Sequence, residues 1–192
     1  MDALSSNQFS SKEEMAEFGG KLLHGTVKTL IDFSKPIIAA VNGPAIGIMF
    51  TTLPLFDLVF ASSTATFLAP FSRLGQAPEG CSTYTFPRLM GTSKAVELLL
   101  LGRKIGVNEA KHLGLVNEIF TDNFMKHVIE QAIILAKLPS GSVKEGKRLM
   151  SKWNKEELHR VNEEECKVLI KRWQSEECLE AVLEFFQRKG KL

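Results

Sequence analysis

The sequence contains few of the residues that bind metals or form cross-links. It has three cysteines and four histidines in 192 residues, and neither set shows the close spacing of a metal site. An odd number of widely spaced cysteines does not form a disulfide framework, so we expect reduced thiols, as in an intracellular compartment. We therefore predict that no metal ion is bound. The residues concerned are Cys81, Cys166, Cys178, His24, His112, His127 and His159.

Long hydrophobic runs are also absent. A membrane-spanning helix needs roughly 18 or more consecutive apolar residues. The longest candidate, residues 37–60, is interrupted by Asn42, Pro44, Pro54 and Asp57. The start of the chain has neither the apolar core of a signal peptide nor the arginines of a transit peptide. We predict a soluble protein that has no membrane partner.

Neither sign of charge is in excess, because 24 Lys and Arg stand against 22 Asp and Glu. A formal net charge of +2 gives no reason to expect a nucleic-acid partner. Phosphate-binding P-loop and Gly-x-Ser-x-Gly motifs do not occur either. The sequence is 44% hydrophobic and 24% charged, which is ordinary for a globular protein. Its length most simply forms one domain with a sizeable core.

The chain is organised around residues 35–57. Pro36 suits the entry to a strand, because it has a fixed φ and no N–H to donate. The apolar run Ile37–Val41 predicts a strand buried on both faces of a parallel sheet. Asn42-Gly43-Pro44 ends this strand, and the apolar residues after Gly47 predict a buried helix. Free N–H groups at such a helix start can bind an anion, or a negative charge that forms during a reaction.

The rest of the sequence alternates between strand and helix patterns and ends in charged amphipathic helices, which indicates the α/β class. A first helix begins after Ser10 or Ser11, which can cap it, and its apolar residues are expected to pack on the sheet. The other expected strands are 58–61, 65–68 and 115–120, and the expected helices are 82–90, 92–101, 107–113, 124–136 and several within 143–189.

Three segments carry a resemblance to a known family. Ala-Ala-Val-Asn-Gly-Pro-Ala-Ile-Gly, at 39–47, resembles the second oxyanion-hole segment of the crotonase (enoyl-CoA hydratase/isomerase) superfamily. Asp-Leu-Val-Phe-Ala-Ser, at 57–62, matches the strand that follows in that family. The segment 65–87, which contains Ala-Pro-Glu-Gly-Cys, resembles the peroxisomal Δ3,Δ2-enoyl-CoA isomerase branch. The resemblance extends from about residue 18 to the end of the chain.

The resemblance implies an α/β, crotonase-like fold: a spiral core of ββα repeats followed by helices. Residues 1–138 would form the core, and 139–192 a C-terminal helical trimerisation region of the same domain. Crotonase domains form trimers, so we expect a homotrimer or a dimer of trimers. Complete members begin with further strands and a segment resembling Ser-Gly-Asn-Asp-Leu, which carries the first oxyanion donor. Met1 lies about where that segment ends, so the first strands are expected to be missing.

The family's isomerase branch places a catalytic glutamate at the position of Glu79. By itself, a Glu before a helix is more often a favourable first-turn charge, and the resemblance reverses that preference. A nearby helix start would lower the pKa of Glu79, whereas an apolar acyl pocket would raise it. For a base that works near neutral pH, the effect of the pocket must be the larger one.

The resemblance also assigns the oxyanion donor and an acyl pocket. The donor falls on the backbone N–H of Ile48, and Gly47 permits a close backbone approach. By spacing alone, Gly43 and Gly47 more simply make a tight turn. The candidates for substrate binding are Gly47, Phe50, Leu68, Pro70 and Phe71, although core packing is the simpler role for any one of the last four.

The resemblance therefore implies a Δ3,Δ2-enoyl-CoA isomerase of unsaturated fatty acid β-oxidation. Its substrate would be an acyl-CoA thioester, and no cofactor would be needed because coenzyme A is part of the substrate. Hydratases of the family use two glutamates, whose matching positions here are Thr51 and Phe71, so a hydratase is not expected. The alternative is a non-catalytic crotonase-like module that binds acyl-CoA or proteins, similar to the domain of chromodomain-Y-type proteins.

The chain ends in Gly190-Lys191-Leu192, which resembles the peroxisomal address Ser-Lys-Leu with Gly in place of Ser. Together with the family resemblance, this predicts import into peroxisomes. Mitochondria are the alternative compartment.

Overall fold

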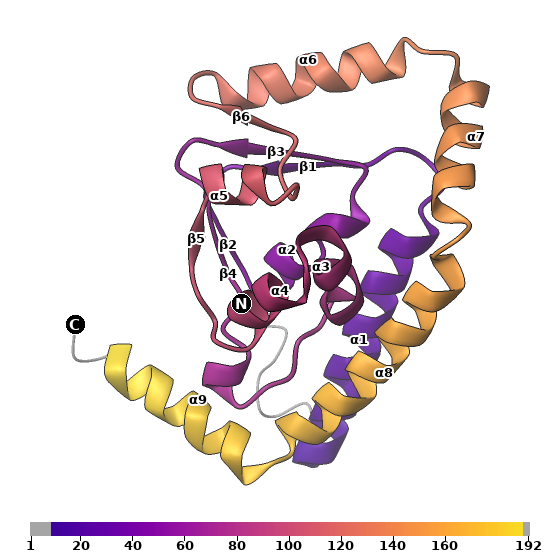
Figure 1. Ribbon diagram of the computed structural model, residues 1–192. Coiled ribbons are helices and arrows are strands. Elements are labelled where there is room, and N and C mark those ends of the chain that lie inside the picture. The colour runs from indigo at the N-terminus through magenta and orange to yellow at the C-terminus, as the bar shows by residue number, and fades with distance from the viewer. Residues whose placement is uncertain (1–8, 190–192) are drawn as a thin grey trace.

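The computed structural model describes residues 9–189, with side chains to residue 187. Helices surround two small sheets, and the helical C-terminal part of the chain curves around one side of them (Figure 1). The strands are β1 (Ile38–Val41), β2 (Pro44–Ile46), β3 (Leu58–Ser62), β4 (Thr66–Leu68), β5 (Ile105–Gly106) and β6 (Glu118–Phe120). The helices are α1 (Lys12–Asp32), α2 (Ile48–Thr51), α3 (Ser82–Met90), α4 (Thr92–Leu99), α5 (Val107–His112), α6 (Phe124–Ala136), α7 (Ser140–Ser151), α8 (Lys155–Trp173) and α9 (Glu176–Lys189), with the 3₁₀ turns η1 (Leu53–Leu55) and η2 (Ser72–Leu74).

The first sheet has the strand order β1-β3-β6, and all its neighbours are parallel. The predicted strand 37–41 is confirmed as β1, which pairs Ala39 with Val59 of β3. Its expected burial on both faces is wrong, because β1 lies at the edge of the sheet and Ala39 is its one buried residue. Edge strands present a row of unpaired backbone groups on their outer side.

The second sheet has the order β2-β4-β5, with β2 and β4 parallel and β4 and β5 antiparallel. Strand β2 was not predicted. The turn at Asn42-Gly43 does not end the extended chain but passes it from the first sheet to the second. Pro44 is tolerated there because it is the first residue of an edge strand. The expected helix after Gly47 is present but short, since α2 has four residues and η1 follows.

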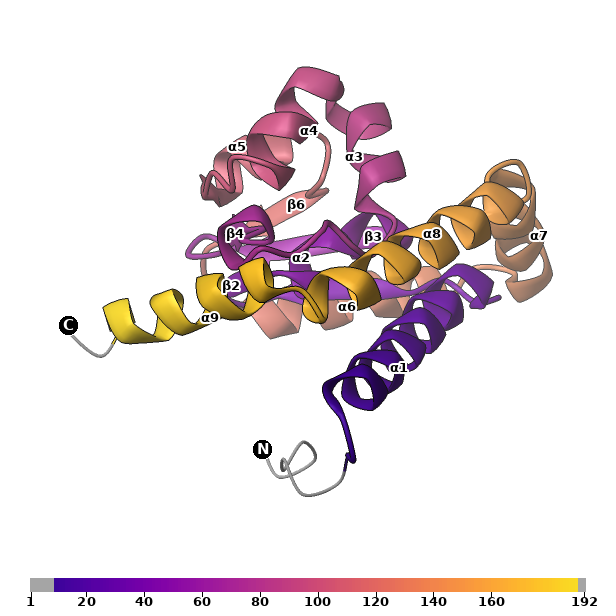
Figure 2. The same cartoon turned by 90° about the horizontal axis from the view of Figure 1, so that it is seen from below.

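The main core lies between the sheets and α3–α5, which cover one side of the strands, whereas α6 covers the other side (Figure 2). The ring of Phe50 lies 5.6 Å from that of Phe67 and 5.0 Å from that of Phe86, measured between centroids. A smaller cluster of Phe60, Phe124 and Val128 joins α6 to β3. The ring contact between Phe50 and Phe86 buries α2 against α3 and thereby positions both helices.

The predicted first helix is confirmed as α1, and the Ser11 side chain caps it by accepting a hydrogen bond from the Glu14 N–H at 3.1 Å. The expected packing on the sheet is wrong, because α1 runs along α8 instead (Figures 1 and 2). The contact is made by glycine: a Cβ at Gly20 would lie 2.4 Å from the Ile170 side chain. The large apolar residues Met15 and Phe18 are exposed.

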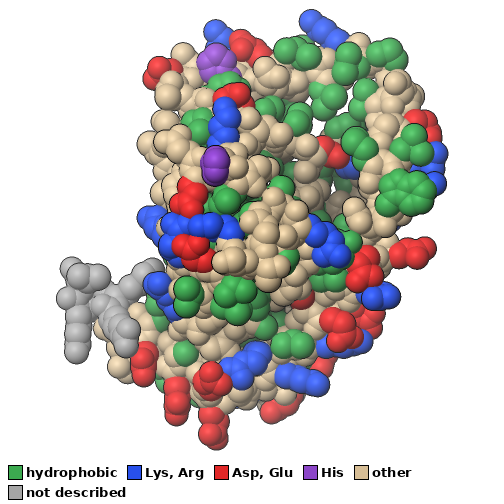
Figure 3. Space-filling view, in the orientation of Figure 1, with side chains coloured by type: hydrophobic (Ala, Val, Ile, Leu, Met, Phe, Trp, Pro, Cys, Tyr) green, Lys and Arg blue, Asp and Glu red, His purple; other side chains and the backbone are tan. Residues whose placement is uncertain are grey.

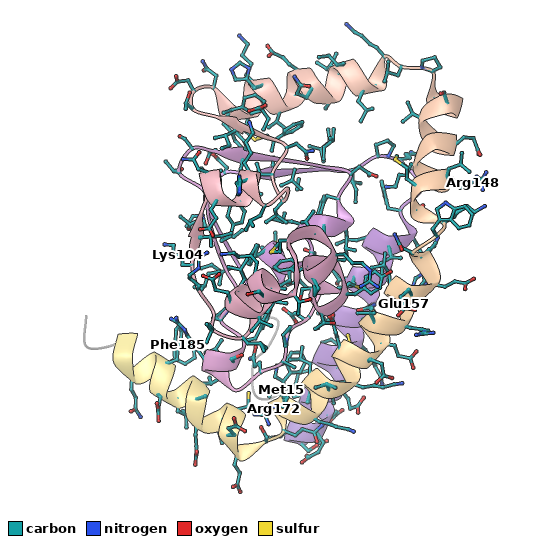
Figure 4. All side chains as sticks on the ribbon, viewed as in Figure 1. Met15, Lys104, Arg148, Glu157, Arg172 and Phe185 are labelled. Atoms are coloured by element: carbon teal, nitrogen blue, oxygen red, sulfur yellow. The ribbon has the colours of Figure 1, made fainter. Side chains whose placement is uncertain are left out.

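The C-terminal helices are attached to the core at several points. Lys147 of α7 binds both the Asp57 carboxylate and the Lys35 carbonyl at 2.7 Å, beside the start of β1. Arg172, labelled in Figure 4 near the corner between α8 and α9, donates to the Gly75 carbonyl at 2.8 Å. Gly75 is left-handed, and a Cβ there would lie 2.7 Å from the Cys178 Cα. The division of the domain at residue 138 stays a prediction.

Within residues 9–189, none of the helices combines the length and the apolar character needed to cross a membrane.

Candidate active site

The turn from β2 into α2 presents a backbone N–H group at Ile48. Gly47 has φ +61°, and its own N–H donates to the Leu68 carbonyl at 2.9 Å. Its carbonyl accepts from the N–H groups of Phe50 and Thr51 at 2.9 and 3.0 Å. Ile48 is the first residue of the helix, and no described residue accepts a hydrogen bond from its N–H. Such a group can bind a substrate oxygen, since the first N–H groups of a helix have no partner within it.

Glu79 precedes a turn in which two consecutive residues are left-handed, Gly80 with φ +71° and Cys81 with φ +62°. Its carbonyl accepts hydrogen bonds from the Ser82 N–H at 3.3 Å and the Ser82 hydroxyl at 2.7 Å, at the start of α3. The Glu79 side chain is partly buried, and its carboxyl group accepts no hydrogen bond from the described residues. It is therefore free to exchange a proton with a bound molecule.

The two segments are held together by Gly80. A Cβ at this residue would lie 2.8 Å from the Thr51 hydroxyl oxygen and 3.0 Å from the Thr52 methyl carbon. The backbone that carries Glu79 consequently packs directly against the C-terminal end of α2, whose first residue is Ile48. The structure brings Glu79 and Ile48 into the same region, although 30 residues separate them in the sequence.

Burial, and then the negative charge of Glu165, raises the pKa of Glu79 to about 7. This direction agrees with the condition stated above, that an apolar environment must outweigh the neighbouring helix start. Because a carboxyl group with this pKa exists in both protonation states near neutral pH, it can take up a proton and return it.

The predicted acyl-pocket residues fall into two groups. Leu68 and Pro70 are partly buried, and the carbonyl of Leu68 binds Gly47. Phe50 and Phe71 are 0% and 3% exposed and belong to the main core. Core packing was the simpler role expected for them from the sequence. A substrate-binding role for all four stays a prediction. Thr51 is buried, and its hydroxyl donates to the Gly47 carbonyl at 3.3 Å.

A groove of about 500 Å³ follows β1 and continues to the outer face of α2. Its lining includes Ile38–Ala45, Met49 and Leu53, but not Glu79. Met49, next to Ile48, is 66% exposed. Another apolar cavity, of about 270 Å³, lies between α6, α7 and the start of β1, and none of the candidate site residues lines it. In the space-filling view the molecule is hollowed beside these two helices (Figure 3). The groove borders α2 through Met49, whereas no residue of α2 lines the cavity.

Comparison with known proteins gives the family. The model of the enoyl-CoA hydratase/isomerase family matches residues 6–191. The chain belongs to this family. Its fold is crotonase-like, as predicted: a crystal structure of an enoyl-CoA hydratase/isomerase from Pseudoalteromonas atlantica is 37% identical, with a TM-score of 0.82 over 84% of this chain and 66% of that one.

Curated family members include isomerases and chromodomain proteins. Enoyl-CoA delta isomerase 2 of Rattus norvegicus is 52% identical over 94% of this chain and 46% of its own length. The peroxisomal enoyl-CoA delta isomerase 3 of Mus musculus is 43% identical over 96% of this chain and 59% of its own. The chromodomain Y-like protein of Homo sapiens is 44% identical over 85% of this chain and 27% of its own. The chain thus spans about half the length of the isomerases, and about a quarter of the chromodomain protein.

Sequence reasoning missed Glu165, a residue of α8 that contacts the site. It follows Glu163 and Glu164, and a run of three glutamates indicates a solvated face. Glu165 is nevertheless only 7% exposed. The signal that could have found it is helical spacing, because the buried residues of α8 recur at 162, 165, 166 and 169. Among the described residues, no cluster of three or more His, Cys, Asp or Glu could hold a metal ion.

The raised pKa of Glu79 predicts a pH-dependent stability. The folded protein keeps the Glu79 proton up to about pH 7, whereas the unfolded chain loses it near pH 4.5. The contribution of this group to the free energy of unfolding is therefore full below about pH 4.5. It falls as the pH rises to about 7, by up to about 3 kcal/mol.

Denaturant unfolding of the chain and of Glu79→Gln, compared across this pH range, isolates the effect because glutamine does not titrate. As the pH rises, the free energy of unfolding of the unsubstituted chain should fall relative to that of Glu79→Gln. If the two free energies instead change with pH in parallel, the Glu79 carboxyl has an ordinary pKa.

Proposed function

We propose that the chain is a Δ3,Δ2-enoyl-CoA isomerase, which moves the double bond of a 3-enoyl-CoA to the 2-trans position in the β-oxidation of unsaturated fatty acids. The observation that carries this proposal is that one partly buried carboxyl group, Glu79, lies in the same region as the N–H of Ile48, which has no acceptor among the described residues. The isomerases among the relatives support it, since they match over nearly the whole of this chain.

In the proposed reaction, Glu79 removes the C2 proton of the thioester. The C2–H bond breaks and an O–H bond forms on the carboxyl group, while the electron pair moves onto the thioester oxygen. The N–H of Ile48 donates to that oxygen and stabilises its negative charge. Glu79 then returns the proton to C4, and the double bond comes to lie between C2 and C3. One carboxyl group suffices for both steps, and water is not consumed.

The residues around the site favour isomerisation over hydration. A hydratase of this family needs two carboxylates that activate and deliver water. Thr51 and Phe71, at the matching positions, offer a hydroxyl that is already hydrogen-bonded and a buried ring. Neither side chain can act as a carboxylate base.

The substrate in this proposal is an acyl-CoA thioester, and coenzyme A enters as part of it. The open side of Gly47, where a Cβ would meet no atom within 4 Å, leaves room for the thioester. Leu68 lies beside this turn, because its carbonyl accepts the Gly47 N–H. Leu68 and Pro70 would contact the acyl chain, and Phe50 and Phe71 belong to the core.

A second candidate function is a non-catalytic module that binds acyl-CoA or a protein. The chromodomain relative, in which the matching segment covers about a quarter of the protein, favours it. The two candidates differ in a calorimetric titration with acyl-CoA, in which a module would bind the thioester and an activity assay would detect no turnover.

The isomerase proposal predicts that Glu79→Gln lowers kcat for 3-enoyl-CoA by about 10²–10⁴-fold, the usual contribution of a general base, and leaves KM little changed. The ultraviolet absorbance of the conjugated 2-enoyl thioester measures the rate. The control is Glu164→Gln, because the Glu164 side chain is 71% exposed on α8 and should be dispensable. Full activity of Glu79→Gln would rule the assignment out.

We further propose that the chain forms a homotrimer or a dimer of trimers. Helix α9 exposes Leu179, Leu183 and Phe186 at helical spacing, and hydrophobic side chains also gather over α6 and α7 (Figure 3). Phe186→Glu should shift the sedimentation coefficient to that of a smaller species, whereas Gln187→Glu adds the same charge one residue later and should not. A chain that sediments as a monomer before any substitution would contradict the proposal.

We propose import into peroxisomes, with mitochondria as the alternative. The C-terminal tripeptide Gly190-Lys191-Leu192, on which this rests, lies outside the described residues, and the mouse relative is named as peroxisomal. A fluorescent protein fused ahead of the whole chain should appear in peroxisomes and become diffuse when the tripeptide is deleted. Mitochondrial fluorescence, or peroxisomal fluorescence without the tripeptide, would contradict this signal.

A further inference from the structure

The buried carboxylate of Glu165 binds the turn that follows Glu79. It accepts hydrogen bonds from the Cys81 N–H at 2.7 Å, the Thr83 N–H at 3.0 Å and the Thr83 hydroxyl at 2.6 Å. Glu165 belongs to α8, more than 80 residues further along the chain. Glu165 therefore caps the N-terminus of α3 from another helix. The side chain of Cys81, the residue at the cap position, makes no capping hydrogen bond itself.

The capped turn is one that costs free energy to form. A left-handed backbone is unfavourable for a residue with a Cβ, and Cys81 is such a residue. It persists where the surroundings determine it, and here the Glu165 carboxylate is bound to the N–H of Cys81 itself. The direction in which the chain leaves Glu79 thus depends on a hydrogen bond to α8.

We propose that Glu165 is a positioning residue for Glu79, which holds the left-handed turn that orients the catalytic carboxyl and sets a second negative charge near it. This inference rests on the proposed isomerase function. The two carboxyl groups differ in their partners: Glu165 has three donors that stabilise its ionised form, and Glu79 has none among the described residues. Burial raises the pKa of Glu165 as well, but these three hydrogen bonds oppose that rise, so we expect Glu165 to ionise before Glu79.

Within the part of the chain that the structure describes, no cation compensates this charge. Besides the two carboxyls, the titratable groups that face each other here are the thiols of Cys81, in the turn, and Cys166, on α8. Burial, with the nearby carboxylates, raises the pKa of Cys81 to about 12 and that of Cys166 to about 11, so both thiols are neutral near pH 7. No described Lys, Arg or His contributes to the pKa of Glu79 or Glu165.

The first test is the pH dependence of kcat/KM for 3-enoyl-CoA. Glu165→Gln removes the negative charge of this side chain. It also places an amide NH₂ group, which is itself a donor, opposite one of the donors at the start of α3. We expect the acid limb of the profile to move to lower pH by about half a unit or more, and kcat to fall by about tenfold or more as Glu79 loses its orientation. The matched control, Thr83→Val, removes one hydrogen bond from the same cap but keeps the charge, so its acid limb should stay in place.

The second test needs no turnover. In a chain labelled with ¹³C at the glutamate carboxyl carbons, Glu79→Gln and Glu165→Gln each remove one resonance and so assign both. Glu165→Gln should also lower the apparent pKa of Glu79, whereas Glu79→Gln should leave that of Glu165 in place, because Glu165 ionises while Glu79 is still neutral. If Glu165→Gln does not fold, the resonance lost in Glu79→Gln still identifies Glu79, and an ordinary glutamate pKa for it would overturn the coupling.

The outcomes separate this inference from the proposed function. A lowered pKa of Glu79 in Glu165→Gln, found in a chain that is inactive, would support the coupling and reject the isomerase. An active chain in which Glu165→Gln keeps the same acid limb, and in which Glu79 does not respond to loss of Glu165, would overturn the role of Glu165 and leave the isomerase intact.

Discussion

The close packing of Gly80 on Thr51 and Thr52 is the contact on which the candidate site depends. It joins two segments that come from different parts of the chain, the short helix that presents the Ile48 N–H and the turn that carries Glu79. A base and an oxyanion donor can serve one thioester only if both are within reach of it. The absence of a Cβ at Gly80 is therefore a geometric requirement of the site.

A second layer of contacts comes from the C-terminal helices. These helices were expected to serve in assembly, yet they also reach the site. Glu165 of α8 binds the start of α3, and Arg172 holds the loop that leads to Glu79 by its hydrogen bond to Gly75. The orientation of the proposed base thus depends on residues that lie 86 and 93 positions later in the sequence. The core and the C-terminal helices consequently form one structural unit around Glu79.

Much of the fold could be predicted from local signals. The Ser11 cap, the apolar strand at 38–41 and the helix at 82–90 are decided by the residues within and beside them. The packing of α1 could not be predicted, because its apolar residues indicated a sheet-facing side, whereas Gly19 and Gly20 meet α8. Strand β2 escaped notice for a similar reason: three residues beginning with proline become a strand only when β4 lies beside them.

The sequence by itself determined the family, and it pointed to the proposed base and to the backbone position of the proposed oxyanion donor, because each depends on residue types in a contiguous motif. Only the tertiary structure decided the environment of Glu79. Burial and the charge of Glu165 raise its pKa, and neither is a property of neighbouring residues in the chain. Desolvation and Coulomb interactions act through space, so a carboxyl group becomes a base suited to neutral pH only when the folded chain surrounds it.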